Sequence, residues 1–168
     1  DDPLYEPNNE LGLATPDDPL YSTQSNIVST NIDDVWTDYN TGDGTQVIAI
    51  IDTGVDYTHP DLEANIWINT AEQNGVEGFD DDGNGYIDDI HGVGIKSIID
   101  RRGYLTGYEL SNDPKDISGH GTHVAGTIAA VANGGGPAVG VAWNCKIMAL
   151  NGFQFISKSD DRPKIYSS

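Results

Sequence analysis

The sequence has little sulfur, little positive charge and no long apolar run. Its single cysteine, Cys145, excludes an intramolecular disulfide. The apolar context VAWNCKIMAL predicts that this cysteine is a small core residue rather than a reactive thiol. No apolar stretch approaches the roughly 18 residues that span a bilayer. The chain starts at Asp1 without a methionine or a signal segment, so we expect a processed or cropped piece of a longer protein.

Lysine and arginine are scarce, with 8 residues against 27 aspartates and glutamates, and the formal net charge is −19. Nucleic acid and anionic membrane surfaces would be repelled, so neither is an expected partner. Such an excess also destabilises the compact state by self-repulsion, which bound cations would relieve. Clustered aspartates are therefore candidate calcium ligands, although most of these carboxylates should form an ordinary solvated surface. The sequence does not predict an oligomeric state.

The length of 168 residues suits one domain. Residues 1–30 are rich in proline, aspartate and asparagine and contain DDPLY twice, which predicts an extended N-terminal arm. Residues 56–118 are polar and punctuated by glycine, so we expect mostly loops there. Residues 151–168 show no clear period and receive no assignment.

Two apolar segments predict buried strands, at 45–52 and 145–150. Between them, residues 122–132 carry apolar side chains at i, i+4 and i+7, which predicts a helix. Alanines and a glycine beside that stripe would let the helix lie close to a sheet, and the glycine run at 134–136 ends it. Strand, helix and strand in this order predict an α/β fold with a parallel sheet.

Two short motifs carry the candidate chemistry. IDTG places Asp52 at the end of the first expected strand, where α/β sheets gather functional groups. GHGTH places His120 between two glycines at the start of the expected helix. A carboxylate beside a histidine holds one imidazole tautomer and stabilises the charged ring, as a general base requires. Taken singly, Asp52 could instead cap a turn, and His120 could be an ordinary loop histidine.

Other interpretations of these motifs are open but less favoured. His120 and His123 lie three apart and could share a zinc ion, although the glutamate-containing metalloprotease spacing is absent. Asp-Thr-Gly also matches aspartic proteases, which need two carboxylates, and the chain has no second copy. GGGPAVG lacks the lysine and hydroxyl residues of a phosphate-binding loop, so a nucleotide is not an expected ligand.

Three segments together are more specific than either motif: VIAIIDTGVDYTHPDL (47–62), GHGTHVAGTIAA (119–130) and GVAWNCKIMAL (140–150). In this order they resemble the subtilases, the subtilisin-like serine proteases. The resemblance covers about residues 17–150. It implies a serine-type endopeptidase that hydrolyses protein or peptide substrates, with Asp52 and His120 as the aspartate and histidine of a catalytic triad. His123 would be the family's second, non-catalytic histidine.

The implied fold is a three-layer α/β parallel sheet of subtilisin-like type, incomplete in this chain. Residues 31–150 would then form the N-terminal half of a peptidase catalytic domain, with a calcium-loop insertion at about 78–92. The insertion contains DDDGNGYIDD, which follows the calcium-loop pattern except that His91 occupies the last ligand position, normally glutamate. The expected calcium ligands are Asp80, Asp82, Asn84, Tyr86, Asp88 and Asp89.

The resemblance also implies a second calcium site, in which the N-terminal arm and the loop after the histidine helix share one ion. Its expected ligands in this chain are Asp18, Asp61, Val131 and Asn133. Such an ion would attach the arm to the core. Calcium is accordingly the expected cofactor.

The family's nucleophilic serine lies in a GTSMA-type segment that these 168 residues do not contain. We therefore expect the isolated chain to be inactive, as a fragment that carries only two triad residues. The alternative is a catalytically inactive, calcium-binding pseudo-protease or interaction module. Acidity, calcium loops and the lack of cysteine pairs favour a secreted, extracellular protein.

Overall fold

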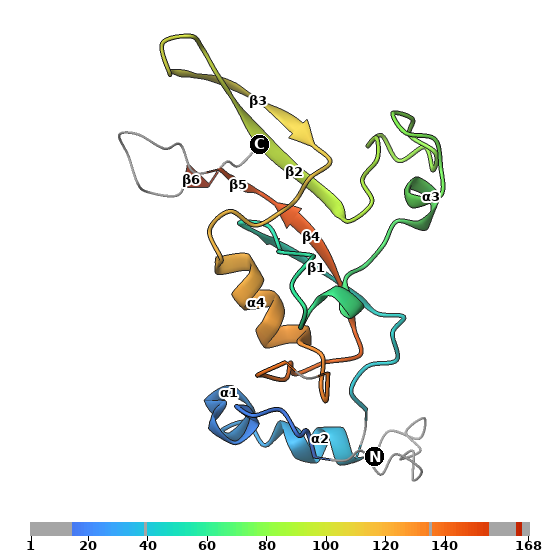
Figure 1. The fold of residues 1–168 in the computed structure, drawn as a ribbon, viewed down its shortest axis with the longest axis vertical. Coiled ribbons are helices and arrows are strands. Elements are labelled where there is room, and N and C mark those ends of the chain that lie inside the picture. Colours follow the sequence, from blue (N-terminus) through green and yellow to red (C-terminus); the bar gives the residue numbers. More distant parts are fainter. Residues whose placement is uncertain (1–14, 39, 135, 155–163, 166–168) are drawn as a thin grey trace, which may run out of the picture.

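The structure is a computed structural model of the chain, and it describes residues 15–38, 40–134, 136–154 and 164–165. A four-stranded sheet in the order β1-β4-β2-β3 forms its centre, with the helix α4 packed beside it (Figure 1). The elements in chain order are η1 (Tyr21–Thr23), α1 (Ser25–Val28), α2 (Ile32–Asp38), β1 (Val47–Asp52), η2 (Glu63–Asn65), α3 (Thr70–Gln73), β2 (Gly92–Ile99), β3 (Leu105–Ser111), α4 (His120–Ala129), β4 (Lys146–Asn151), β5 (Phe153–Gln154) and β6 (Lys164–Ile165).

The parallel centre of the sheet agrees with the prediction. Strand β1 pairs in parallel with β4 along its whole length, from Val47 opposite Lys146 to Asp52 opposite Asn151. Strand β4 also pairs in parallel with β2. The expected strands and helix are present, and their ends differ from the predicted ones by at most three residues. The prediction of an α/β fold with a parallel sheet is thus confirmed.

Residues 56–118 contain more regular structure than expected. Strands β2 and β3 form an antiparallel hairpin that extends well beyond the body of the molecule (Figure 1). Three of its large apolar residues, Ile98, Ile99 and Leu110, are exposed. The hairpin is stabilised by the hydrogen bonds between its two strands and by the contact of β2 with β4. A local apolar pattern in the sequence reveals neither.

Helix α4 packs on β1 and β4 through small side chains. Ala125 and Ala129 are fully buried and lie at the centre of the interface, while Val124 and Ile128 flank it and are only partly buried. The short alanine side chains let the helix approach the sheet closely. The residues buried in this core are Ile50, Val55, Leu62, Ile66, Ala125, Ala129, Ile147 and Ala149. Cys145 is buried, and burial raises the pKa of its thiol, in agreement with a core role.

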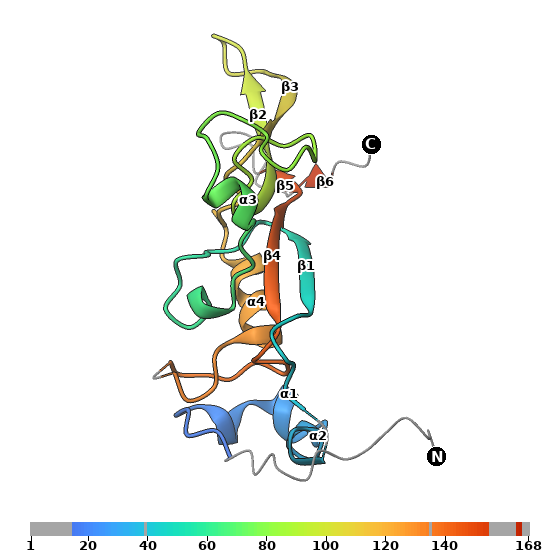
Figure 2. The same cartoon turned by 90° about the vertical axis from the view of Figure 1, so that its right-hand side faces the viewer.

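Only one face of the β1–β4 pair is covered within the described residues. Figure 2 shows α4, η2 and α3 on the same side of these strands. On β1, the side chains of Val47 and Ile51 are 43% and 70% exposed. The described part of the chain therefore provides two of the three layers of the expected fold class.

The N-terminal region differs from the extended arm that the sequence suggested. From Tyr21 onward it forms the short helices η1, α1 and α2, which lie beside the chain that leads into β4 (Figure 1). Ile27 and Trp36 are buried against Val139 and Trp143, and the two tryptophan rings are 4.3 Å apart between centroids. These short helices are stabilised by tertiary packing, because helices of this length are not stable alone. Residues 1–14 of the expected arm lie outside the described residues.

No helix within the described residues is long and apolar enough to span a membrane. In the unassigned tail, β5 and β6 pair in antiparallel fashion. Positions 155–163 and 166–168 of that tail are outside the described residues.

Candidate active site and calcium loops

The end of β1 and the start of α4 meet, although they are far apart in the sequence. Asp52 is the last residue of β1 and His120 is the first residue of α4, 68 positions later. Glycine permits this approach, since a Cβ on Gly121 would lie 2.0 Å from the carbonyl oxygen of Gly54. Gly54 itself has φ +97°, a left-handed conformation that turns the chain away from the strand.

Asp52 and His120 form a direct contact. The Nδ1 atom of His120 lies 2.7 Å from Oδ1 of Asp52, and that oxygen also accepts a hydrogen bond from the amide of Thr53. Burial alone would raise the pKa of Asp52, but the hydrogen bonds from His120 and Thr53 outweigh it and lower that pKa. Asp52 is therefore ionised at neutral pH and accepts a hydrogen bond from the Nδ1–H of a neutral His120 ring, which leaves Nε2 of His120 as the proton acceptor.

The imidazole is accessible while its partner is not. The side chain of His120 is 68% exposed, against 17% for Asp52. A group outside the described residues can therefore reach the ring. An ionised carboxylate behind an accessible histidine is the orienting half of a nucleophile-activating triad.

The structure bears on the two rival interpretations of these motifs, a zinc site and an aspartic protease. Within the described residues, the one group of three or more ligating side chains that could hold a metal ion contains neither His120 nor His123. His123 instead lines a groove beside α4 together with His59 and Asp61. The α/β fold with a central helix also conflicts with the all-β fold of aspartic proteases.

In the expected calcium loop, carboxylates accept hydrogen bonds from the backbone of the loop itself. Asp80 and Asp82 each accept a hydrogen bond from the amide of Asn84 at 3.0 Å. Asp89 is buried and accepts hydrogen bonds from the side-chain amides of Asn69 and Asn84. Burial raises the pKa of Asp89, and the charges of Asp82 and Glu72 act in the same direction. A bound cation would relieve this accumulation of negative charge.

The other expected ligands are placed differently. The carboxylate of Asp88 accepts hydrogen bonds from the amide of Gly78, so in this arrangement it holds the start of the loop. The amide of Tyr86 donates to Oδ1 of Asn84 at 2.7 Å.

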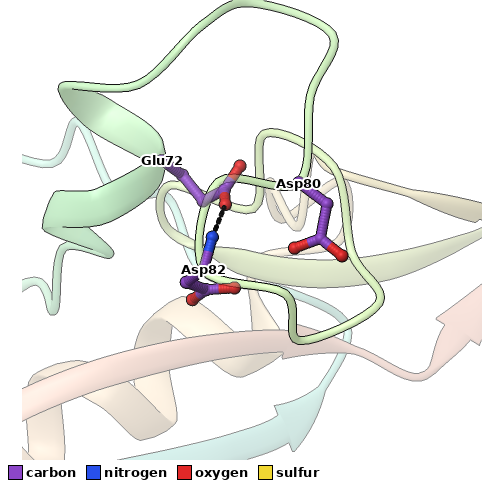
Figure 3. Close-up of side chains that lie close together, drawn as sticks. All are labelled: Glu72, Asp80 and Asp82. Atoms are coloured by element: carbon purple, nitrogen blue, oxygen red, sulfur yellow. Dashed lines mark hydrogen bonds between the residues drawn. The ribbon is translucent and has the colours of Figure 1, made fainter.

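Glu72, on α3, is a residue of this loop that the sequence did not suggest. Its carboxylate is buried and accepts hydrogen bonds from the amides of Asp81, Asp82 and Asp88. Glu72, Asp80 and Asp82 each offer an oxygen within 4.8 Å of the others (Figure 3). No motif could have identified Glu72, because it precedes the loop and only tertiary structure brings it there.

The expected second calcium site contains two buried carboxylates with unsatisfied oxygens. Asp18 and Asp61 are 5% and 6% exposed, and among the described residues Oδ1 of each has no hydrogen-bond partner. Burial raises the pKa of Asp61, and the charge of Asp18 raises it further. Gly136 lies against this pair, since a Cβ there would come 1.8 Å from Oδ1 of Asp61. Buried unpaired carboxylate oxygens are costly unless an ion satisfies them, so these residues fit a cation.

The loop after α4 contacts the same two aspartates. The amide of Asn133 donates to Oδ2 of Asp18 at 3.0 Å, and the amide of Val131 donates to the carbonyl of Asp61 at 2.9 Å. Oδ1 of Asn133 accepts from the amide of Asp17 at 2.8 Å. In this arrangement the side chain of Asn133 therefore joins the arm to the loop.

Known proteins similar to this chain are proteases. A profile of the subtilase family matches residues 43–166. The chain is 44% identical over 104 residues to subtilisin-like protease 1 of Plasmodium berghei (strain Anka), covering 62% of this chain and 15% of that protein. It is 35% identical over 147 residues to the thermophilic serine proteinase of Bacillus sp. (strain AK1), covering 86% of this chain and 28% of that protein.

Among solved structures, a protease of Pseudoalteromonas arctica is similar, with 32% identity and a TM-score of 0.46, covering 82% of this chain and 39% of that one. The chain thus spans well under half the length of these relatives. The family profile covers most of the chain and includes both Asp52 and His120. The chain therefore belongs to the subtilase family.

Proposed function

We propose that this chain is part of a serine-type endopeptidase and supplies two of its three catalytic residues. The observation that carries the proposal is the 2.7 Å contact between Asp52 and His120 at the carboxyl end of β1. His120 would accept the proton of a serine hydroxyl at Nε2 and later return it to the leaving amine. Asp52 would keep the ring in the required tautomer and stabilise its charge. Its substrates would be proteins or peptides.

The nucleophilic serine would come from outside these 168 residues, because the sequence contains no GTSMA-type segment. The isolated chain should accordingly fail to hydrolyse peptides. In a related serine protease, loss of the serine or the histidine costs about six orders of magnitude in kcat. Clear turnover by the isolated chain that disappears in His120→Ala would overturn this point.

The proposal is tested in the protein encoded by the complete reading frame. Peptide hydrolysis by the wild type and loss of about six orders of magnitude in kcat in His120→Ala would support it. The alternative, a calcium-binding pseudo-protease or interaction module, predicts a reading frame that never reaches a serine segment. In that case neither protein would show turnover, and the endopeptidase proposal would be wrong.

We further propose two structural calcium sites. The first would use the loop residues Asp80, Asp82 and Asn84, with Asp89 as a further carboxylate and Glu72 holding the backbone of the loop. The second would use Asp18 and Asp61, whose unsatisfied oxygens support it. Bound calcium would supply positive charge that compensates the buried carboxylates. With a net charge of −19, such sites would suit an extracellular setting, where we place this protein.

A further inference from the structure

The loop that leads into α4 contains a carboxylate that is saturated with hydrogen bonds. Oδ1 of Asp116 accepts from the hydroxyl of Thr53 at 2.9 Å and from the amides of Ser118 and Gly119 at 2.8 and 2.9 Å. Oδ2 accepts from both the amide and the hydroxyl of Thr122, at 2.9 and 2.6 Å. Neither the motifs nor the triad assigns a role to Asp116.

These contacts connect the two elements that carry the catalytic pair. The amides at a helix start have no partners within the helix, and Asp116 satisfies three of them around the start of α4. Thr53 extends the connection to β1, since its hydroxyl donates to Asp116 and accepts from the amide of Gly121 at 3.0 Å. Thr53 follows Asp52 in the chain, and Gly119 and Gly121 flank His120. Three of the bonded residues, Thr53, Gly119 and Gly121, are therefore chain neighbours of a member of the pair.

The carboxylate of Asp116 is partly buried and charged. Burial alone would raise the pKa of Asp116, but the Thr122 hydroxyl and the surrounding amides outweigh it and lower that pKa. A negative charge at a helix N-terminus is also favoured by the helix dipole. Within the described residues, Asp116 makes no hydrogen bond to Asp52 or His120, so it can act on them only through the backbone and Thr53.

Packing alone does not hold the histidine, because its side chain is 68% exposed. Its position depends on Asp52 and on the backbone of residues 118–122. Without Asp116, the amides at this helix start would hydrogen-bond to water instead. The hydrogen-bonded connection from α4 to β1 would then lose its central acceptor. A displacement of 1 Å in such a pair is enough to break a hydrogen bond of about 2.7 Å.

We propose that Asp116, acting through Thr53 and the amides at the start of α4, is a positioning residue that sets the contact between Asp52 and His120. This inference rests on the proposed function, because it assigns a role within the same site. It adds to the site the Asp116 carboxylate, which is fixed by hydrogen bonds and does not contact the reacting groups.

The test uses ring-nitrogen NMR on the 15N-labelled 168-residue chain, at a pH where the imidazole is neutral. His120→Ala assigns the signals of His120, and Asp52→Asn shows the spectrum of an unpaired ring. We expect the wild type to show Nδ1-protonated His120 with a downfield Nδ1 proton. Asp116→Asn and Thr53→Val should lose both features, whereas Thr53→Ser, which keeps the hydroxyl, should retain them.

Asp100→Asn is the matched control, because Asp100 also holds turn amides, from Arg102 and Tyr104, but lies on the distant hairpin. Its spectrum should equal that of the wild type. Should Asp116→Asn fail to fold, the nearly isosteric Thr53→Val and its rescue by Thr53→Ser decide the question. Retention of the Asp52-bonded tautomer in folded Thr53→Val or Asp116→Asn would overturn the inference and leave the proposed function intact. A wild-type spectrum unaffected by Asp52→Asn would instead contradict the proposed function itself.

Discussion

At the residue scale, the carboxylates of this molecule differ in how their negative charge is stabilised. Asp52 has its carboxylate fixed by the Thr53 amide and by His120, so it presents one oxygen to the ring. Asp18 and Asp61 show the opposite condition, because each has a buried oxygen without a partner. The pKa of Asp52 is lowered, whereas burial raises that of Asp61. The proposed catalytic aspartate and this candidate calcium ligand thus differ in the environment of their carboxylates.

Replacing Asp52 by asparagine should cost kcat far more than KM in the complete protein. The amide can donate to the ring and so favours the wrong tautomer, an effect worth about 10⁴-fold in serine proteases. Peptide-hydrolysis kinetics would measure it, with Asp100→Asn as a control of equal charge change. A loss of less than tenfold would contradict an orienting role for Asp52.

Replacing Asp61 by asparagine should change stability in opposite directions with and without calcium. The pKa of Asp61 is raised above its usual 3.8, so the calcium-free chain loses stability as pH rises through the folded value. At pH 7 without calcium, Asp61→Asn should therefore raise the free energy of unfolding by about 1–3 kcal/mol. With calcium present, the same variant should be less stable than the wild type.

Urea unfolding at pH 4 and pH 7, in calcium and in chelator, would measure both effects. The advantage of Asp61→Asn over the wild type in chelator should shrink at pH 4. Equal destabilisation by the substitution under all four conditions would contradict the account of this site.

At the element scale, the catalytic pair depends on how closely α4 approaches β1. The interface is built from Gly121, Ala125 and Ala129, all of them buried. Apolar residues at i, i+4 and i+7 made this helix predictable from the sequence, as the continuous apolar runs did for β1 and β4. Their packing also brought Asp52 and His120 together as expected.

Other elements were not predictable in this way. The hairpin of β2 and β3 carries glycine, lysine and serine among its apolar residues, so its pattern resembles a loop, and cross-strand pairing stabilises it. The helices before β1 are too short to be stable alone and depend on Trp36 and Trp143. Glu72 and Asp116 lie outside the motifs and accept hydrogen bonds from backbone amides within them, so only the folded chain reveals them.

Two glycines of α4 provide a matched test of this interface. A Cβ at Gly121 would lie 2.0 Å from the carbonyl oxygen of Gly54, whereas nothing lies within 4 Å of one at Gly126. Gly121→Ala should therefore destabilise the chain by about 1–3 kcal/mol through overpacking. Gly126→Ala should stabilise it by about 0.5–1 kcal/mol, because alanine favours the helix. Thermal unfolding would measure both, and equal effects of the two substitutions would contradict the close approach.

At the scale of the whole molecule, the dominant property is a net charge of −19 spread over a single chain. The structure concentrates part of this charge in the 80–89 loop and part in the pair Asp18 and Asp61. The N-terminal region is attached to the core near that pair, so its docking and cation binding should be coupled. Stability should then depend on calcium more than on ionic strength.

Calcium should raise the melting temperature of the 168-residue chain, and a chelator should lower it. At a concentration 100-fold above its dissociation constant, one bound ion adds about 2.7 kcal/mol, or about 5–10 °C for a chain of this size. Magnesium at equal ionic strength should stabilise less, because the flexible carboxylate loop suits the larger ion. Equal shifts with magnesium would contradict the calcium sites. So would a full calcium response in the triple variant that combines Asp80→Asn, Asp82→Asn and Asp61→Asn.

We expect Asp52 and His120 to act as one catalytic unit, which a double-mutant cycle on kcat in the complete protein would measure. Residues that act as a unit are strongly non-additive. The protein with both Asp52→Ala and His120→Ala should be about as slow as the one with His120→Ala alone. Losses that simply add on a free-energy scale would show two independent residues and contradict it.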